Sequence, residues 1–183
     1  RRYLVHFSSH NLPQVFTDVL VLGSGVGGLR AALEASRTAS GLIVTKARLE
    51  DGCTNEAQGG IAVALAPGDS PKDHFEDTIE AGVGLCNAEA VRILTEEGPA
   101  RVTELLRLGA QFDRCGSELS FTREGGHRCA RILHANGDAT GAATEGALVR
   151  AVRERQSVAL FENTFAIDLL TLDGACHGAL IWN

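Results

Sequence analysis

Three glycines between a strand-like run and a helix-like run limit the fold of this chain more than any other feature. The run Thr17–Leu22 is continuously apolar in its last four residues, which is typical of a parallel strand covered on both faces. Gly23, Gly25 and Gly28 follow in the spacing GxGxxG, and apolar residues at helical spacing begin directly after them. Strand, glycines and helix in this order are the context of a dinucleotide-binding turn. The sequence therefore predicts an α/β fold with a parallel sheet.

Each of the three glycines has its own physical role in such a turn. Gly23 permits the tight turn, Gly25 lets the backbone approach a pyrophosphate, and Gly28 lets the helix pack closely on the strand. The pyrophosphate lies at the helix N-terminus, where N–H groups and the helix dipole favour negative charge. The alternative is a glycine-rich turn that binds no ligand.

The segment after this helix predicts a second buried strand and a long loop. The strand Ser40–Lys46 ends in a lysine, whereas NAD-binding proteins commonly place an acidic residue there. Lys46 fits a contact to an adenosine phosphate or ribose oxygen, and equally a solvated strand end. Residues 47–60 have the glycines and polar residues of a functional loop. Within it, Gln58–Gly60 would let backbone amides approach a flat ring system.

The rest of the chain predicts further helices and strands. Three helices are expected, the second interrupted at Gly98-Pro99: Pro71–Ala81, Ala88–Leu108 and Asp138–Arg155. The segment Phe112–His134 is expected to be loop or hairpin. Three strand-like runs at the C-terminus are expected to form a β-meander: Ser157–Glu162, Phe165–Asp173 and Cys176–Asn183.

Composition argues against several classes of function. The chain has 23 acidic and 17 basic residues, so its net charge of −6 opposes general binding to nucleic acid. The five cysteines are odd in number and widely spaced, which predicts reduced thiols and neither disulfides nor a metal site. No apolar run approaches the roughly 20 residues of a membrane span. We expect a soluble, cytoplasmic protein without metal, membrane or nucleic-acid partners.

The loop residues Gly52–Leu65, GCTNEAQGGIAVAL, resemble the flavoproteins of the succinate dehydrogenase, fumarate reductase and L-aspartate oxidase group. Members of that group wrap FAD with a glycine turn of this type, a strand ending in Ser/Thr-Lys and a loop ending in Ala-Gln-Gly-Gly or similar. The resemblance implies a Rossmann-like FAD-binding domain over residues 17–183, after an N-terminal extension at residues 1–16. It implies that the glycine turn after the first strand contacts the pyrophosphate and that the lysine contacts the adenosine side. It also implies that the loop contacts the flavin and its linker. The implied cofactor-binding residues are Gly23, Ser24, Gly25, Val26, Gly27, Gly28, Lys46, Cys53, Thr54, Asn55, Glu56, Ala57, Gln58, Gly59 and Gly60.

Two features distinguish members within this group. The segment Phe121–Gly141, FTREGGHRCARILHANGDATG, resembles that of L-aspartate oxidases, where Thr-Arg-Glu-Gly-Gly-His precedes Arg-Ile-Leu-His and Asp-Ala-Thr-Gly. Cys129 and Ala130 depart from the His/Arg content of that segment. Cys53 stands where succinate dehydrogenases carry the histidine that bonds covalently to FAD. The resemblance therefore implies noncovalent FAD.

The glutamate of the Thr-Arg-Glu-Gly-Gly-His string, Glu124, is implied to orient the substrate. L-Aspartate and succinate are both four-carbon dicarboxylates, and aspartate alone carries an ammonium group. At about 4 Å a carboxylate attracts that ammonium by roughly 4 kcal/mol at an effective dielectric of 20. The alternative is a surface ion pair with Arg123 or Arg128. His127 and His134 are weaker candidates for a dianionic substrate.

The resemblance implies FAD-dependent oxidation of L-aspartate to iminoaspartate, with oxygen or fumarate as acceptor, at the first step of quinolinate and NAD biosynthesis. It implies no catalytic residue in this stretch, because the capping domain with its substrate arginine and histidines follows later in the family. The chain begins at Arg1 and contains no methionine, so we expect an N-terminal piece that is inactive alone. The alternatives are a fumarate reductase-like or succinate dehydrogenase-like flavoprotein and a noncatalytic dinucleotide-binding module.

Overall fold

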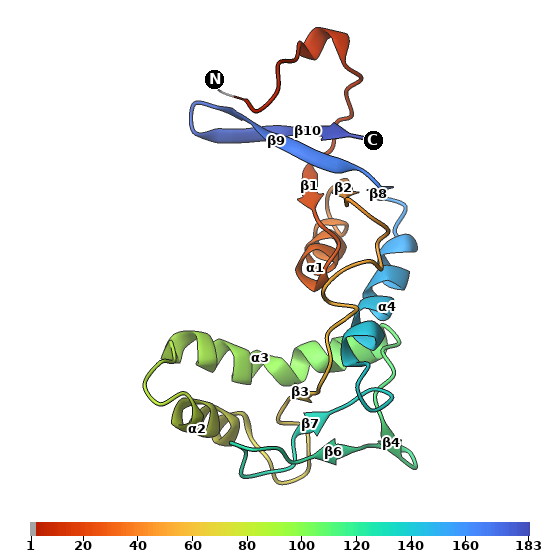
Figure 1. Ribbon diagram of the computed structural model, residues 1–183. Coiled ribbons are helices and arrows are strands. Elements are labelled where there is room, and N and C mark those ends of the chain that lie inside the picture. The colour runs from red at the N-terminus through yellow and green to blue at the C-terminus, as the bar shows by residue number, and fades with distance from the viewer. Residues whose placement is uncertain (1–2) are drawn as a thin grey trace. The chain divides into compact units, whose positions relative to one another are not determined.

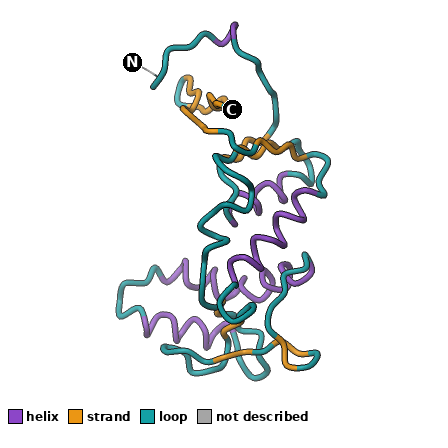
Figure 2. The backbone as a smooth tube through the Cα atoms, turned by 45° about the vertical axis from the view of Figure 1, so that its right-hand side comes forward, coloured by secondary structure: helices purple, strands orange, loops and turns teal. Residues whose placement is uncertain are grey.

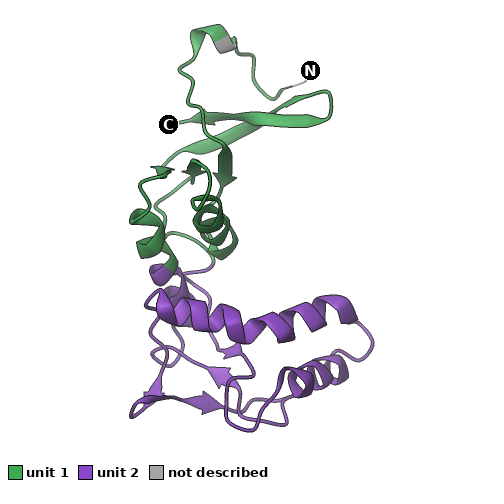
Figure 3. Cartoon of the chain, turned by 180° about the vertical axis from the view of Figure 1, so that it is seen from behind, with its two compact units in different colours: residues 1–53, 148–183 green, residues 54–147 purple. Residues whose placement is uncertain are grey.

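The computed structural model describes residues 3–183, which divide into two compact units (Figure 3). Unit 1 combines the described residues up to Cys53 with Leu148–Asn183, and unit 2 is Thr54–Ala147. The boundary expected between an N-terminal extension and a domain starting at residue 17 stays a prediction. Residues 1 and 2 of that extension lie outside the described residues.

Unit 1 contains the parallel sheet that the sequence predicts. Its three strands lie in the order β1-β2-β8, all parallel: β1 (Val19–Leu22), β2 (Gly41–Val44) and β8 (Val158–Phe161). Helix α1 (Val26–Ala35) connects β1 to β2 (Figure 1) and buries Leu29, Ala32 and Leu33. All four residues of β2 are buried, as expected for the central strand of a covered parallel sheet.

The expected C-terminal β-meander is not confirmed. Strands β9 (Phe165–Leu172) and β10 (Ala175–Trp182) form an antiparallel hairpin whose turn is Asp173-Gly174. Both turn residues have positive φ, as a two-residue hairpin turn of this composition requires. The third run, β8, follows a helix instead of a tight turn, so it returns to the parallel sheet through a crossover connection.

Two further segments complete unit 1. The 3-10 helix η1 (Ser9–Asn11) lies in the expected N-terminal extension. The backbone N–H of Leu4 donates to the Asp168 carboxylate at 2.6 Å, so this extension contacts the β9–β10 hairpin. Helix α4 (Thr140–Arg153) begins in unit 2 and ends in unit 1.

Unit 2 combines two helices with short antiparallel strands (Figure 2). The helices are α2 (Pro71–Ala81) and α3 (Ala88–Arg107). The strands form a sheet in the order β3-β7-β6 and a β4-β5 pair: β3 (Ile61–Ala62), β4 (Arg114–Cys115), β5 (Glu118–Leu119), β6 (Phe121–Thr122) and β7 (Ile132–Leu133). A buried apolar core that includes Val63, Val102, Phe112 and Leu133 joins α3 to the strands.

The interruption expected in α3 at Gly98-Pro99 is wrong, because the helix continues through both residues. Pro99 removes one hydrogen bond of the helix ladder. Val91, Thr95 and Val102 nevertheless lie buried on one face of the helix on both sides of the proline. Burial of that face stabilises the continuous helix by more than the lost bond costs.

No helix within residues 3–183 combines the length and the apolar character that a membrane span needs.

Candidate functional site

The glycine turn of unit 1 has the backbone geometry that its sequence predicts. Gly23 adopts φ +101°, and its N–H donates to the carbonyl of Val44 at 2.8 Å. A Cβ on Gly28 would collide with the carbonyl of Gly23. The positive φ of Gly23 and the close packing at Gly28 therefore each require glycine.

The N-terminus of α1 presents backbone and no anionic side chain. Gly25 is the N-cap without a side-chain cap, and the first turn contains no acidic residue. A Cβ on Gly27 would meet nothing within 4 Å, so the space beside this turn is open. Ser24 is buried, and its hydroxyl lies 3.1 Å from that of Thr45, which joins the turn to the end of β2. A pyrophosphate fits this arrangement, because the first turn of the helix carries no acidic residue and the positive end of the helix dipole favours an anion.

Helices α2 and α3 differ from α1 at their first residues. The Ser70 side chain accepts from the N–H of Asp73 at 3.1 Å, and the Asn87 side chain accepts from the N–H of Ala90 at 3.1 Å. Their N-termini are closed by the protein's own side chains. Of these three helices, only α1 lacks a side-chain cap from its N-cap residue.

The other expected cofactor residues lie at the end of β2 and in the loop after it. Lys46 is exposed directly after β2, at the carboxyl end of a parallel strand, where ligands of such sheets bind. Cys53 is an exposed free thiol in unit 1. Residues 54–60 belong to unit 2.

The start of α4 holds the glycines of this loop in unit 2. The N–H of Gly59 donates to the Asp138 carboxylate, and the Thr140 hydroxyl donates to the carbonyl of Gly59 at 2.6 Å. The N–H of Gly141 donates to the carbonyl of Ala57 at 3.0 Å. Gly59 has φ +83°, and a Cβ there would meet nothing within 4 Å. These contacts from the start of α4 thus fix the loop. The space beside Gly59 stays open, which a bound ring system requires.

Glu124 lies two residues after the end of β6, and its side chain is 54% exposed. Its Oε1 lies 3.3 Å from Nε2 of His134, which directly follows β7. The same nitrogen lies 3.1 Å from the hydroxyl of Thr122. Glu124 is therefore oriented from one side and open on the other.

The alternative ion pair between Glu124 and Arg128 is wrong. The Arg128 guanidinium binds three acidic side chains of α2 instead: its Nε lies 2.5 Å from Asp77, and its Nη1 lies 3.0 Å from Glu76 and 3.3 Å from Asp73. The Glu124 carboxylate faces a histidine and not this arginine.

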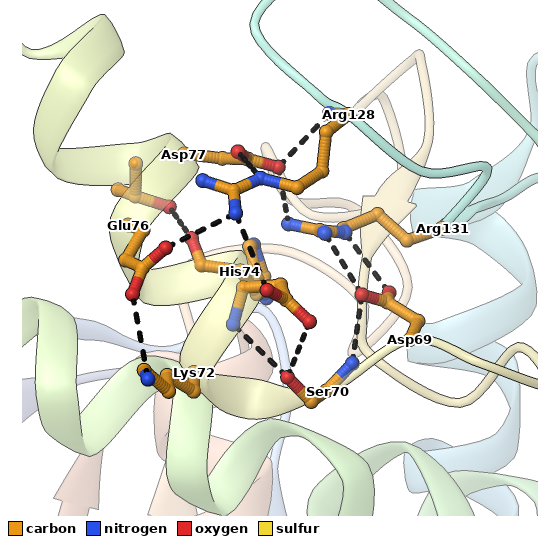
Figure 4. Close-up of polar contacts among 10 residues, drawn as sticks. Asp69, Ser70, Lys72, His74, Glu76, Asp77, Arg128 and Arg131 are labelled. Carbon is orange, nitrogen blue, oxygen red and sulfur yellow. Dashed lines mark hydrogen bonds and ion pairs between the residues drawn. The ribbon is translucent and has the colours of Figure 1, made fainter.

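Unit 2 also contains a buried charge cluster that sequence reasoning missed (Figure 4). Arg131 is fully buried and donates to Asp69 at 2.8 and 3.0 Å, and it lies 3.1 Å from Asp77. Asp69 and Asp77 are themselves only 1% and 5% exposed. The sequence signals for this cluster were the spacing of the acidic residues on α2 and the two arginines three residues apart. Neither signal indicates which arginine pairs with which carboxylate, because the partners lie far apart in the sequence.

The surroundings shift two pKa values in this cluster. Burial by itself raises the pKa of Asp77, but hydrogen bonds from the backbone and guanidinium of Arg128, with the charges of Arg128 and Arg131, outweigh it and lower the pKa. Burial lowers the pKa of His74, and the charges of Arg131 and His127 lower it further. The carboxylate is therefore ionised at neutral pH, and the His74 imidazole is neutral.

Within residues 3–183, no group of three histidine, cysteine or acidic side chains is placed to hold a metal ion.

A family model described as FAD binding domain matches residues 18–183. The L-aspartate oxidase of Streptomyces coelicolor is 53% identical over 159 residues, which cover 86% of this chain and 27% of that protein. The chloroplastic L-aspartate oxidase of Oryza sativa is 48% identical over 157 residues, 85% of this chain and 24% of that protein. The chain thus spans about a quarter of the length of these curated relatives.

Two solved structures are similar in fold to this chain. Mycobacterium smegmatis Sdh1 matches with a TM-score of 0.82 and 33% identity, over 91% of this chain and 30% of that one. FrdA of E. coli quinol fumarate reductase matches with a TM-score of 0.84 and 27% identity, over 90% of this chain and 29% of that one.

Proposed function

Since the chain belongs to the FAD binding domain family of the succinate dehydrogenase and fumarate reductase flavoproteins, with FAD as its cofactor, we propose that the full protein is an L-aspartate oxidase. It oxidises L-aspartate to iminoaspartate in the cytoplasm, with oxygen or fumarate as electron acceptor. The product feeds the synthesis of quinolinate and NAD. One observation carries the proposal: a half-exposed carboxylate, Glu124, held by His134 in the segment that resembles L-aspartate oxidases.

The residues of unit 1 bind the adenosine diphosphate half of the cofactor. The turn Gly23–Gly28 receives the pyrophosphate at the N-terminus of α1, and Lys46 contacts the adenosine side. Cys53 and the loop through Gly60 contact the flavin and its linker. Because a thiol stands where covalent members of the family carry histidine, FAD is held noncovalently. When bound, FAD supplies the redox chemistry by accepting a hydride from the substrate.

Glu124 orients the substrate through charge. Its carboxylate attracts the ammonium group of aspartate and repels a dicarboxylate that lacks one. The imidazole of His134 lies beside one carboxylate oxygen, Oε1, and the ammonium approaches the exposed side of Glu124. Selectivity for aspartate over succinate follows from this difference, since the two molecules otherwise present the same pair of carboxylates.

The test uses the full-length protein with bound FAD under anaerobic conditions. L-Aspartate should bleach the flavin absorbance, and succinate should not. Bleaching by succinate alone would indicate a succinate dehydrogenase-like enzyme. Bleaching by neither, together with tight FAD binding, would indicate a noncatalytic module.

A further inference from the structure

We propose that Asp77 is a positioning residue, which holds the loop of residues 123–131 in the shape that presents Glu124 to the substrate. This β6–β7 loop connects the two short strands, and Asp77 reaches it from helix α2. The inference rests on the proposed function, because it assigns the loop to substrate recognition.

The contacts of Asp77 join its carboxylate to both the backbone and the side chains of the loop (Figure 4). Its Oδ2 accepts from the backbone N–H of Arg128 at 3.0 Å, and its Oδ1 accepts from Nε of the same residue at 2.5 Å. Its Oδ2 also lies 3.1 Å from Nη1 of Arg131. One buried carboxylate therefore accepts hydrogen bonds from one main-chain position and one guanidinium group, and it faces the charge of a second guanidinium.

The loop depends on these contacts because its own strands are short. Only two residue pairs join β6 to β7, Phe121↔Leu133 and Thr122↔Ile132. Gly126 adopts φ +80°, and a Cβ there would lie 3.5 Å from the Cβ of Ala81 at the end of α2. The middle of the loop thus lies against the same helix that carries Asp77.

A short turn transmits the position of Arg128 to Glu124. The N–H of His127 donates to the carbonyl of Glu124 at 3.3 Å, which closes a turn over residues 124–127. Arg128 follows this turn directly, and its N–H is bound to Asp77. Releasing that N–H frees the C-terminal end of the turn, and the Glu124 backbone at its other end then moves with it.

Charge explains why the position requires a carboxylate. Arg131 is fully buried and is compensated by Asp69 and Asp77 together. In Asp77→Asn the amide keeps one acceptor oxygen for the two donors of Arg128, and a neutral group then faces the buried charge of Arg131. The backbone N–H and Nε of Arg128 compete for that oxygen, so the loop loses part of its attachment while the shape of the side chain is kept.

The experiment compares Asp77→Asn with Glu76→Gln in the full-length flavoprotein at matched FAD occupancy. Glu76 is the matched control, because it binds the same guanidinium from the adjacent position of α2 but is 44% exposed. Asp77→Asn should lower kcat/KM for aspartate on the order of tenfold and leave fumarate reduction within about twofold. Glu76→Gln should change neither rate. Equal losses for both substrates would overturn the proposal.

A double variant tests whether Asp77 acts through Glu124. In a Glu124→Gln background, Asp77→Asn should cause no further loss of aspartate preference. A full additional loss there would overturn the proposal, because it would place the effect of Asp77 elsewhere.

Hydrogen exchange separates this inference from the proposed function. Asp77→Asn should speed exchange of the amides of residues 127 and 128, and Glu76→Gln should not. Unchanged exchange would overturn the inference whatever the substrate. If Glu124→Gln leaves aspartate oxidation intact while exchange still responds to Asp77, the substrate role of Glu124 fails and the attachment of the loop stands.

Should Asp77→Asn fail to fold, Arg128→Met provides the second variant. It removes the guanidinium but keeps the backbone N–H that Asp77 binds, and Arg128 is 43% exposed. A selective loss for aspartate, smaller than that expected of Asp77→Asn, supports the proposal. Equal effects on both substrates, or none, contradict it.

Discussion

Replacing Glu124 by glutamine should weaken aspartate oxidation and leave fumarate reduction intact or improved. Glutamine keeps the length and shape of the side chain, and its carbonyl oxygen can occupy the place of Oε1, which lies 3.3 Å from Nε2 of His134. The charge alone is removed. Fumarate has no ammonium group, so it loses no attraction and is no longer repelled by a like charge.

The magnitude follows from the exposure of Glu124. Two unit charges about 4 Å apart interact by about 4 kcal/mol at an effective dielectric of 20 and by about 1 kcal/mol in bulk water. The Glu124 carboxylate is 54% exposed, so the interaction lies between these limits. We expect a loss of about 1 to 3 kcal/mol in transition-state stabilisation for aspartate, which is about 5- to 150-fold in kcat/KM.

The assay is steady-state kinetics of the full-length enzyme with aspartate and with fumarate, at matched FAD occupancy. Glu118→Gln is the matched control, because Glu118 is an exposed carboxylate on the β4–β5 pair of the same unit. Equal losses for aspartate and fumarate would refute the charge argument and indicate a structural or general catalytic role. No loss for either would leave Glu124 as a surface partner of His134.

Four further predictions concern the cofactor and stability. Gly25→Val should abolish FAD binding in a fluorescence titration, because a side chain there occupies the space where the backbone meets the pyrophosphate, whereas its φ of −65° is one that a valine adopts; unchanged affinity would contradict the turn assignment. Acid or heat should release free FAD from the holoenzyme, because Cys53 stands in place of the histidine that bonds to FAD; flavin retained on the denatured chain would contradict noncovalent binding. Gly28→Ala should lower the Tm in thermal unfolding, since its Cβ would collide with the carbonyl of Gly23; an unchanged Tm would count against that packing. The pKa of Asp77 is lowered by folding, so its contribution to stability is present above the unfolded value of about 3.9 and is lost as pH falls through the folded value. In urea unfolding, the free energy of unfolding of Asp77→Asn should therefore fall less steeply with decreasing pH than that of the parent protein. Identical pH slopes would contradict this contribution of Asp77.

Local signals in the sequence were sufficient to predict the elements around the glycine turn. The continuous apolar run before Gly23 and the helical spacing after Gly28 predicted β1 and α1, because a buried parallel strand and an amphipathic helix each have their own periodicity. Helix α2 has the predicted bounds, Pro71–Ala81, since Ser70 caps it and a proline starts it. Such signals act within one or two helical turns and need no knowledge of the rest of the chain.

Tertiary structure decided the features that join distant segments. Strand β8, the first of the three strand-like runs near the C-terminus, pairs with β2 and not with β9, because the preceding helix makes it a crossover strand. Likewise, Asp77 meets Arg128, 51 residues away, and Asp69 meets Arg131, 62 residues away. The sequence determined the local conformation around the glycine turn and α2. The charge of a side chain, however, does not indicate which distant residue it will pair with. That choice depends on how α2 and the β6–β7 loop pack against one another, so the attachment of Glu124 became visible only in the folded chain.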